Sequence, residues 1–187
     1  LSSRQIDKYD VRLQVTGCYG YETVASANVC IDPDPRATGV TQRVCTPSSV
    51  GTGTQGAPVS VSSVDVDASP GKTRFKITIQ NAGRGEPFRN GLTFLNKCNP
   101  NDPTGLDKYD ELSFVELTDV SISGTSIKAS CNPVDNNHVR LINGKATIYC
   151  EYGSIRGNAA FKTPLTVKLR YGYRDVQFRD ITIVPSE

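Results

Sequence analysis

Six cysteines carry the clearest chemical signal in this chain of 187 residues: Cys18, Cys30, Cys45, Cys98, Cys131 and Cys150. They lack the CxxC pairs that are typical of zinc ribbons and of thioredoxin-like redox sites. A single histidine in the chain leaves little to complete a mixed Cys/His zinc site. The even number therefore favours disulfide bonds, made in an oxidising compartment, over six buried free thiols.

The six cysteines can pair in many ways, and sequence alone does not choose among them. Local geometry ranks two bonds first: Cys131–Cys150 around a hairpin region and Cys30–Cys45 across a proline-rich loop. Cys18 and Cys98 are then left over, and a bond between them would tie the N-terminal strands to a long loop. In the chain-entropy model, closing loops of this size stabilises a fold by about 3–4 kcal/mol per bond. Because a typical domain has a net stability of about 5–15 kcal/mol, such crosslinks indicate a protein that persists outside the cell.

Other reactive side chains form no recognisable catalytic centre. Any Ser-His-Asp or Cys-His nucleophile would have to use His138, the single histidine, and no serine lies in a GxSxG elbow. We expect His138 in an exposed loop. Three acidic pairs raise the alternatives of a carboxylate-based glycosidase or a calcium site: Asp32/Asp34, Asp65/Asp67 and Asp110/Glu111.

These alternatives are the weaker ones. Prolines separate Asp32 from Asp34, and nothing nearby resembles a calcium-binding loop. Asp65 and Asp67 share a strand face and are expected to meet solvent or basic neighbours. The glycine-rich segment 81–85 lacks phosphate-loop spacing and is predicted to be a turn. The sequence thus predicts a protein that is not an enzyme and that holds neither cofactor nor metal.

The charge balance argues against a nucleic-acid partner. Lys and Arg number 21 and Asp and Glu 19, which gives a net charge of +2 and little capacity to neutralise phosphates. The basic strand faces are therefore expected to be solvated: Arg74/Lys76 and Lys168/Arg170/Arg174.

No apolar run approaches the roughly 20 residues that cross a bilayer, so we expect no membrane insertion. A chain that has no Met and opens at Leu1 is expected to be a processed, mature one.

The N-terminal part of the chain predicts short strands. Alternation puts Val11, Leu13 and Val15 on one face of a strand over residues 9–16. Glycines at the ends of 17–20 indicate a turn and hence an N-terminal hairpin. The pattern further predicts strands over 21–31 and 42–46, a proline stop at 32–35 and a linker over 47–56.

The rest of the chain predicts more strands and no helix. The cleanest strand covers 73–81, with Phe75, Ile77 and Ile79 inward. A phase slip at 62–63 indicates a bulge, and Asn143-Gly144 is the dipeptide that favours a tight type I′ turn. The other predicted strands cover 58–68, 92–95, 112–123, 126–130, 139–142, 146–152, 164–171 and 175–184.

Strands of this number and spacing predict an all-β fold, an immunoglobulin-like antiparallel β-sandwich. We expect the sandwich over residues 57–187. Residues 1–50 are expected to form a strand or hairpin region that either extends one of its sheets or pairs with a neighbouring subunit.

One segment carries a family resemblance. A proline-led strand from Pro58 is followed by a strand that ends in the pattern hydrophobic-x-hydrophobic-x-Asn-x-Gly, at Ile77, Ile79, Asn81 and Gly83. Residues 58–184 resemble the immunoglobulin-like cell-adhesion-related (CARDB-like) domain of bacterial and archaeal surface proteins. The long loop 97–110, the N-terminal hairpin and the six cysteines depart from that family's pattern. The resemblance implies an extracellular structural or adhesive role without catalytic residues.

The leading functional hypothesis is a secreted structural subunit of the cell envelope, located at the cell surface. It would form a filament, pilus or layer with copies of itself or with other envelope proteins. Val11, Leu13 and Val15 would fill a groove in the neighbour when the N-terminal strand adds to an open sheet edge. The alternatives are an extracellular adhesion or carbohydrate-binding module and, third, a carboxylate-based hydrolase.

Overall fold

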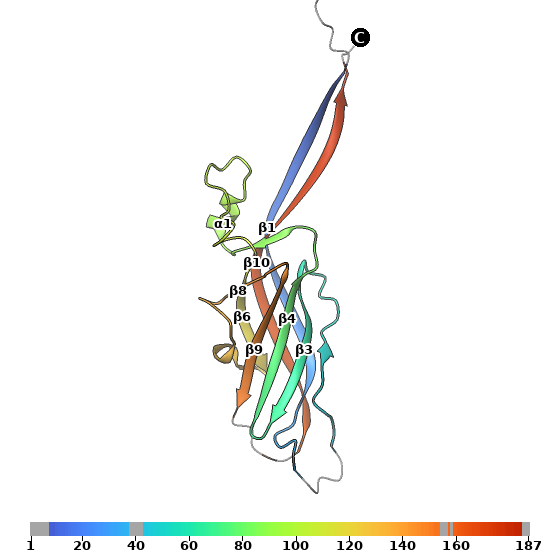
Figure 1. Ribbon diagram of the computed structural model, residues 1–187, viewed down its shortest axis with the longest axis vertical. Coiled ribbons are helices and arrows are strands. Elements are labelled where there is room, and N and C mark those ends of the chain that lie inside the picture. Colours follow the sequence, from blue (N-terminus) through green and yellow to red (C-terminus); the bar gives the residue numbers. More distant parts are fainter. Residues whose placement is uncertain (1–7, 38–42, 154–156, 158, 185–187) are drawn as a thin grey trace, which may run out of the picture.

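The structure is a computed structural model that describes residues 8–37, 43–153, 157 and 159–184. In these residues the protein is a β-sandwich of two antiparallel sheets, as the sequence predicts (Figure 1). The first sheet has the strand order β1-β10-β6-β7, with β5 beside β10 and β8 beside β6. Its strands are β1 (Tyr9–Ile31), β5 (Glu86–Phe88), β6 (Phe114–Ile122), β7 (Thr125–Ser126), β8 (His138–Arg140) and β10 (Phe161–Ile183).

The second sheet has the strand order β2-β3-β4-β9 and covers one face of the first. It consists of β2 (Val50–Gly51), β3 (Val59–Ser69), β4 (Lys72–Asn81) and β9 (Lys145–Gly153). Alternation on β4 buries Phe75, Ile77 and Ile79 completely, because every second side chain of a strand points to the same face. The ladder between β3 and β4 shifts between Val61 and Ser63, at the predicted bulge.

The core lies between the two sheets and forms one large hydrophobic cluster. Cys131 and Cys150 lie inside it, and the disulfide between them joins the segment after β7 to β9. The Asn143-Gly144 turn connects β8 to β9 with both residues at positive φ, as the sequence predicts. Ile142 and Lys145 exchange backbone hydrogen bonds of 2.8 and 3.1 Å across it.

The predicted N-terminal hairpin is wrong. Residues 17–20 do not turn the chain, because β1 is one continuous strand of 23 residues. The predicted break between the last two strands is also absent, and β10 is equally long. The two strands pair over their whole length, so that Gly20 lies opposite Gly172.

Gly172 in β10 is explained by the close approach of the Phe88 ring to its backbone. A Cβ atom on Gly172 would lie 2.1 Å from the Phe88 ring, which is fully buried there. Glycine inside a strand often marks such a contact with a neighbouring group instead of a turn. The register of β1 also pairs residues 9–31 with β10 of the same chain.

Three shorter elements differ from the predictions. Residues 92–95 fall in a helix, α1 (Leu92–Lys97), and not in a strand. Residues 126–130 are divided between β7 and a 3-10 turn, η1 (Lys128–Ser130). Residues 43–46 form no strand, and residue 42 lies outside the described part. The predicted linker 47–56 contains β2, which pairs with β3.

Candidate functional site: the two-stranded arm

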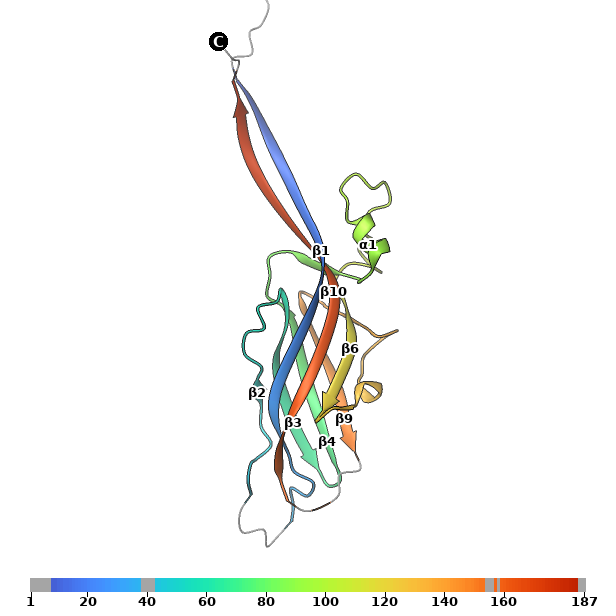
Figure 2. The same cartoon turned by 180° about the vertical axis from the view of Figure 1, so that it is seen from behind.

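The long strands β1 and β10 continue beyond the sandwich as a two-stranded ribbon (Figures 1 and 2). Next to the sandwich, β5 pairs with residues 172–174 of β10. Beyond that point the described chain offers β1 and β10 no strand partner except each other. We call residues 9–16 together with 176–183 the arm. Each of its strands therefore has one open edge.

The arm has two chemically different faces. Directly opposed residues in an antiparallel pair lie on the same face, and successive residues alternate between faces. The register pairs odd numbers with odd numbers, for example Val11 with Ile181. We call the odd-numbered side of the arm the apolar face; its members are Tyr9, Val11, Leu13, Val15, Gln177, Arg179, Ile181 and Ile183.

The apolar face is the outward continuation of the core. In the sandwich half of β1 the odd-numbered residues, among them Ala25, Val29 and Ile31, are buried under the second sheet. In the arm the same face continues without a covering layer, and Val15 is 65% exposed. In the arm, the strands thus keep the apolar alternation of the core, although no described part of the chain covers that face.

The even-numbered face of the arm is mainly polar, with Val176 and Phe178 as its apolar members. Arg12 Nε donates to Asp180 Oδ1 at 2.8 Å, and the Arg12 guanidinium also lies over the Phe178 ring at 5.8 Å. Thr182 Oγ1 donates to Asp10 Oδ1 at 2.6 Å. Such cross-strand pairs stabilise a ribbon that faces water.

Four tyrosines anchor the base of the arm. Tyr19 and Tyr21 of β1 lie against Tyr171 and Tyr173 of β10, with ring centroids 5.8 to 6.4 Å apart. Their rings meet in edge-on, tilted and stacked arrangements, which are favourable for aromatic pairs. The cluster fixes the ribbon at the point where it leaves the sandwich.

Glycine lets the turn after β4 close over this cluster. The Tyr173 hydroxyl donates to Asn81 Oδ1 at 3.1 Å. A Cβ atom on Gly83 would lie 2.1 Å from the same hydroxyl. The segment 81–85 is therefore a turn, as predicted, and it is shaped to receive a tyrosine.

Burial makes the tyrosine cluster sensitive to alkali. Burial is the main cause that raises the pKa of Tyr171 and of Tyr173, and also that of Tyr19, where the charge of Asp175 adds to it. Tyr171 is fully buried; its hydroxyl lies 2.9 Å from Thr23 Oγ1 and accepts a hydrogen bond from the Val59 amide at 3.1 Å. The folded state therefore keeps phenol protons that the unfolded chain loses.

We expect the free energy of unfolding to fall as the pH rises above about 10, the ordinary pKa of tyrosine, because the unfolded chain then binds fewer protons than the folded one. Tyr171→Phe should reduce this alkaline loss. At pH 7 it should cost about 1–3 kcal/mol, since the Val59 amide loses its acceptor. Urea unfolding at pH 7 and at two alkaline pH values measures both effects. Tyr149→Phe, at an exposed position, should leave the pH 7 value unchanged; equal losses in the two variants would contradict the prediction.

A disulfide braces the arm from the side. Cys18 of β1 is bonded to Cys98, which follows α1. A small second cluster of buried Phe88, Cys98 and Leu112 surrounds this bond, with Phe94 and Leu95 of α1 packed against it. Packing of these two partly buried side chains accounts for a helix in a segment whose alternation favours a strand. The loop 89–113 thus forms a lobe tied to β1 next to the arm.

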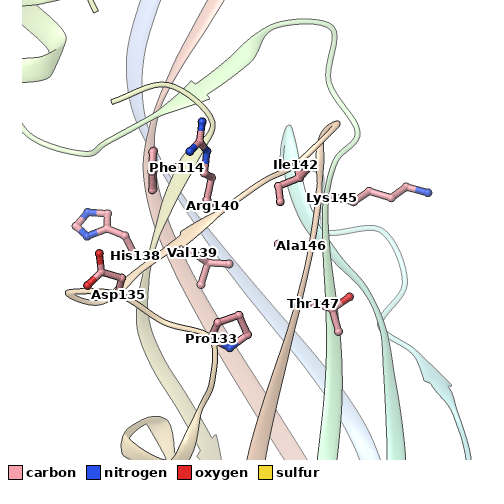
Figure 3. A pocket seen from close by; sticks show the side chains of 10 residues that line it. All are labelled: Phe114, Pro133, Asp135, His138, Val139, Arg140, Ile142, Lys145, Ala146 and Thr147. Carbon is pink, nitrogen blue, oxygen red and sulfur yellow. The ribbon is translucent and has the colours of Figure 1, made fainter. Parts of the chain in front are cut away.

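A shallow hollow lies on the flank of the sandwich, between β8 and β9 (Figure 3). Phe114, Val139, Ile142 and Ala146 provide apolar lining, and Arg140 and Lys145 bring positive charge. The Arg140 guanidinium lies 5.5 Å from the centre of the Phe114 ring, and that of Arg89 lies 4.7 Å from it. Cations over an aromatic face are attracted by its electron density.

His138 lies at the rim of this hollow and is half-buried at the start of β8, not in a loop (Figure 3). Its Nδ1 lies 2.7 Å from the carbonyl oxygen of Asn136. Asp135 lies nearby and exchanges two backbone hydrogen bonds with His138. This arrangement closes a tight turn and brings no serine or cysteine nucleophile to the histidine among the described residues.

The acidic pairs have local structural partners. Asp32 is buried and forms an ion pair with Arg43. Lys76 pairs with Asp65, which therefore meets a basic neighbour as predicted. Glu111 pairs with Lys97 in the lobe. The described residues contain no group of three or more His, Cys, Asp or Glu side chains that could hold a metal ion.

The basic strand faces are largely neutralised by acidic neighbours. Arg74 pairs with Glu151 at 2.7 Å, Arg170 with Glu22 at 3.0 Å, and Arg174 with Glu86 at 2.8 Å. All three are ion pairs between partly or fully exposed side chains. Such pairs fit solvated sheet faces.

Sequence reasoning found one strand of the arm and missed the role of the other. Val11, Leu13 and Val15 lie together on the apolar face, as their alternation predicts. Ile181 and Ile183 lie opposite Val11 and Tyr9 and complete that face. Their own alternation in β10 was a signal, but only the register between two distant segments shows that they join the same surface.

The fold and the crosslinks together define a class: a small, disulfide-stabilised, all-β sandwich, which fits a stabilised extracellular protein. Its three bonds are Cys18–Cys98, Cys30–Cys45 and Cys131–Cys150. Local geometry ranks the last two first, and Cys18–Cys98 is the pair that they leave over. In the part of the chain that the structure describes, no helix is long and apolar enough to cross a membrane. Comparison with protein families, with curated proteins and with solved structures gives no match.

Proposed function

We propose that this protein is a secreted structural subunit of the cell envelope that assembles into a filament, pilus or layer through its arm. The observation that carries the proposal is the arm itself: a projecting ribbon with an uncovered apolar face and two open edges. A two-stranded ribbon is marginally stable in water and usually needs a third strand or a packed face. Open edges favour the addition of a strand from another chain.

The proposal includes strand pairing between protomers. In the single chain β1 and β10 satisfy each other on one side only, so a neighbour's strand can add to either outer edge of the arm. Backbone hydrogen bonds would supply affinity, and the side chains Val11, Leu13 and Val15 would supply packing. We also propose that the protein acts without catalysis and that its partners are copies of itself or other envelope proteins. The CARDB-like resemblance of residues 58–184 is also part of this proposal.

Deletion of residues 1–16 tests the proposal. None of residues 9–16 is fully buried, and the deletion keeps Cys18, so the sandwich should fold with its three disulfides. We expect a folded monomer by circular dichroism and sedimentation, and no polymers by negative-stain microscopy. Polymers like those of the intact chain would refute the role of the arm.

A matched pair of point variants separates the arm from general surface hydrophobicity. Val15 and Ile142 are exposed to a similar degree, 65% and 71%, but Ile142 lines the hollow on the flank. Val15→Asp should prevent assembly, and Ile142→Asp should leave it unchanged. The reverse result would move the assembly surface from the arm to the flank.

A second candidate function is an extracellular adhesion or carbohydrate-binding module, which the hollow of Figure 3 favours. Its apolar floor and the two arginines beside Phe114 are suited to a sugar ring that carries an acidic group. This candidate predicts dispersed monomers that bind a polysaccharide saturably. Microscopy of the intact chain therefore distinguishes the two functions.

A further inference from the structure

β1 is the edge strand of the first sheet, and in the described part of the chain no strand pairs with its outer edge. Proteins commonly protect such an edge with lysine, proline or a bulge, because unpaired backbone groups favour the addition of another strand. β1 contains neither lysine nor proline between Tyr9 and Ile31, and its register with β10 is unbroken. The outer edge of β1 is therefore a long, regular ladder.

The backbone groups that face this open edge belong to the even-numbered residues of β1. The N–H and C=O of one residue face the same edge of a strand, and successive residues face opposite edges. On the β6 side of β10, the Ser123 amide donates to the Pro164 carbonyl oxygen at 3.1 Å, and the Thr118 hydroxyl donates to that of Lys168 at 3.1 Å. Even-numbered residues of β10 thus face away from β1. Because they lie opposite even-numbered residues of β1, these in turn face away from β10.

The edge strand of the second sheet, β9, is protected in a way that β1 is not. Tyr149 exchanges backbone hydrogen bonds of 2.8 and 2.7 Å with Asn132. The amide and the carbonyl of Glu151 both bond the Ser130 hydroxyl, at 2.9 and 2.8 Å. Among the described residues, nothing comparable bonds the even-numbered backbone groups of β1.

We infer that the arm of one copy adds to the β1 edge of the next copy, with β10 of the arm against β1 of the sandwich. The inference rests on the proposed function and names the strand that is given and the strand that receives it. The receiving segment is residues 22–28, whose even-numbered side chains are all exposed. It is close in length to the arm strand 176–183. Below it, Cys30 is buried and bonded to Cys45.

The backbone pattern puts the apolar face of the added arm on the core side of the sheet. On the outer edge of β10 the outward groups also belong to even-numbered residues, so an antiparallel ladder sets even opposite even and odd opposite odd. The odd-numbered residues of β1 in the sandwich, such as Ala25 and Val29, face the core. The added Ile181 and Ile183 would therefore extend the core face. Beneath them lies the edge of the second sheet, where β2 carries the half-buried Val50 (Figure 2).

This addition gives every copy the same direction. β10 runs antiparallel to β1 within one chain. If β10 of the arm also runs antiparallel to β1 of the next copy, the two copies point the same way. The surface that is given, the β10 edge of the arm, differs from the surface that receives it, the β1 edge of the sandwich. Such a contact is heterologous and does not close at two copies, so it can repeat along a filament.

Proline at outward-facing positions tests the inference on the full-length chain. Proline removes an N–H, and on the open side of an edge strand that N–H makes no bond within the chain, so folding is kept. Ser26→Pro blocks the receiving edge, and Thr182→Pro blocks the β10 edge of the arm. Each should weaken association by about tenfold or more in analytical ultracentrifugation. Ser26→Ala and Thr182→Ala, which keep the N–H, should associate like the wild type, and so should Gln14→Pro, on the other edge of the arm.

A mixture of the two proline variants tests the head-to-tail arrangement. Ser26→Pro keeps a working arm, and Thr182→Pro keeps a working receiving edge. Together they should form a one-to-one dimer that does not grow. A two-fold pairing of β1 with β1 would instead leave Thr182→Pro associating like the wild type, and that result would overturn the inference. Circular dichroism checks that each variant folds, and Val24→Pro repeats the test at the neighbouring outward position if Ser26→Pro does not.

The outcomes separate this inference from the proposed function. If the wild type associates and the deletion of residues 1–16 abolishes association, but folded Ser26→Pro and Val24→Pro associate like the wild type, the arm assembles the protein and the β1 edge does not receive it. If the wild type remains monomeric at every concentration, or if the deletion leaves association intact, the proposed function fails together with the inference.

Discussion

Reduction of the three disulfides is expected to unfold this protein at neutral pH. The bonds close loops with sequence separations of 80, 15 and 19 residues. In the chain-entropy model these loops stabilise by about 4.5, 3 and 3 kcal/mol. Together this is an upper value of about 11 kcal/mol, since the Cys30–Cys45 loop lies within the Cys18–Cys98 loop. It rivals the whole net stability of a typical domain, about 5–15 kcal/mol.

Circular dichroism and urea unfolding with and without a thiol reductant measure this effect. Variants that lack one bond at a time identify its source. Cys131→Ala with Cys150→Ala should be more damaging than its loop length indicates, because both sulfur atoms lie in the core and their loss also leaves a cavity. A fully reduced protein with an unchanged urea midpoint would show that the crosslinks do not carry the stability.

Arg43→Ala should cause the largest loss among single charge deletions, about 3–5 kcal/mol. Its partner Asp32 is 1% exposed and directly follows β1, where the proline-rich loop begins. Arg43 also donates to the carbonyl oxygens of Asp34 and Pro35, at 3.4 and 2.9 Å. Without the Arg43 side chain, the buried Asp32 carboxylate has no counter-charge. The loop closed by Cys30–Cys45 also loses the hydrogen bonds from Arg43 to its backbone.

The arm supplies a matched control for this prediction. Arg12 and Asp180 form the same type of pair, but their side chains are exposed to water. Exposed pairs contribute little to stability, so Arg12→Ala should leave the urea midpoint nearly unchanged. Adding Asp32→Asn to Arg43→Ala should restore part of the loss, because the buried charge is removed. Equal losses for the two arginine variants would contradict the account.

Local alternation was sufficient to predict much of this fold. It places Phe75, Ile77 and Ile79 in the core, because a strand with one buried face must alternate. It also finds the bulge at 62–63 and the Asn143-Gly144 turn, whose conformations depend on a few neighbouring residues. These features are determined by short-range chemistry, and the sequence displays that chemistry directly.

The arm could not be predicted in the same way, because it depends on contacts between the two ends of the described chain. Gly17 and Gly20 have the composition of a turn, yet they lie in a strand because β10 pairs with them residue by residue. Likewise, the segment around Phe94 is helical because it packs in a lobe that the Cys18–Cys98 bond closes. A single sequence does not display long-range register, and register decides which residues share the apolar face.

The absence of any turn in β1 and β10 has a mechanical consequence. The same two strands form both the projecting ribbon and one wall of the sandwich, and no flexible joint separates the two parts. A force applied at the far end would therefore travel along the backbone ladders into the body of the molecule. Peeling β1 from that end would release one residue pair after another and would stop at Cys18, where a covalent bond takes the load.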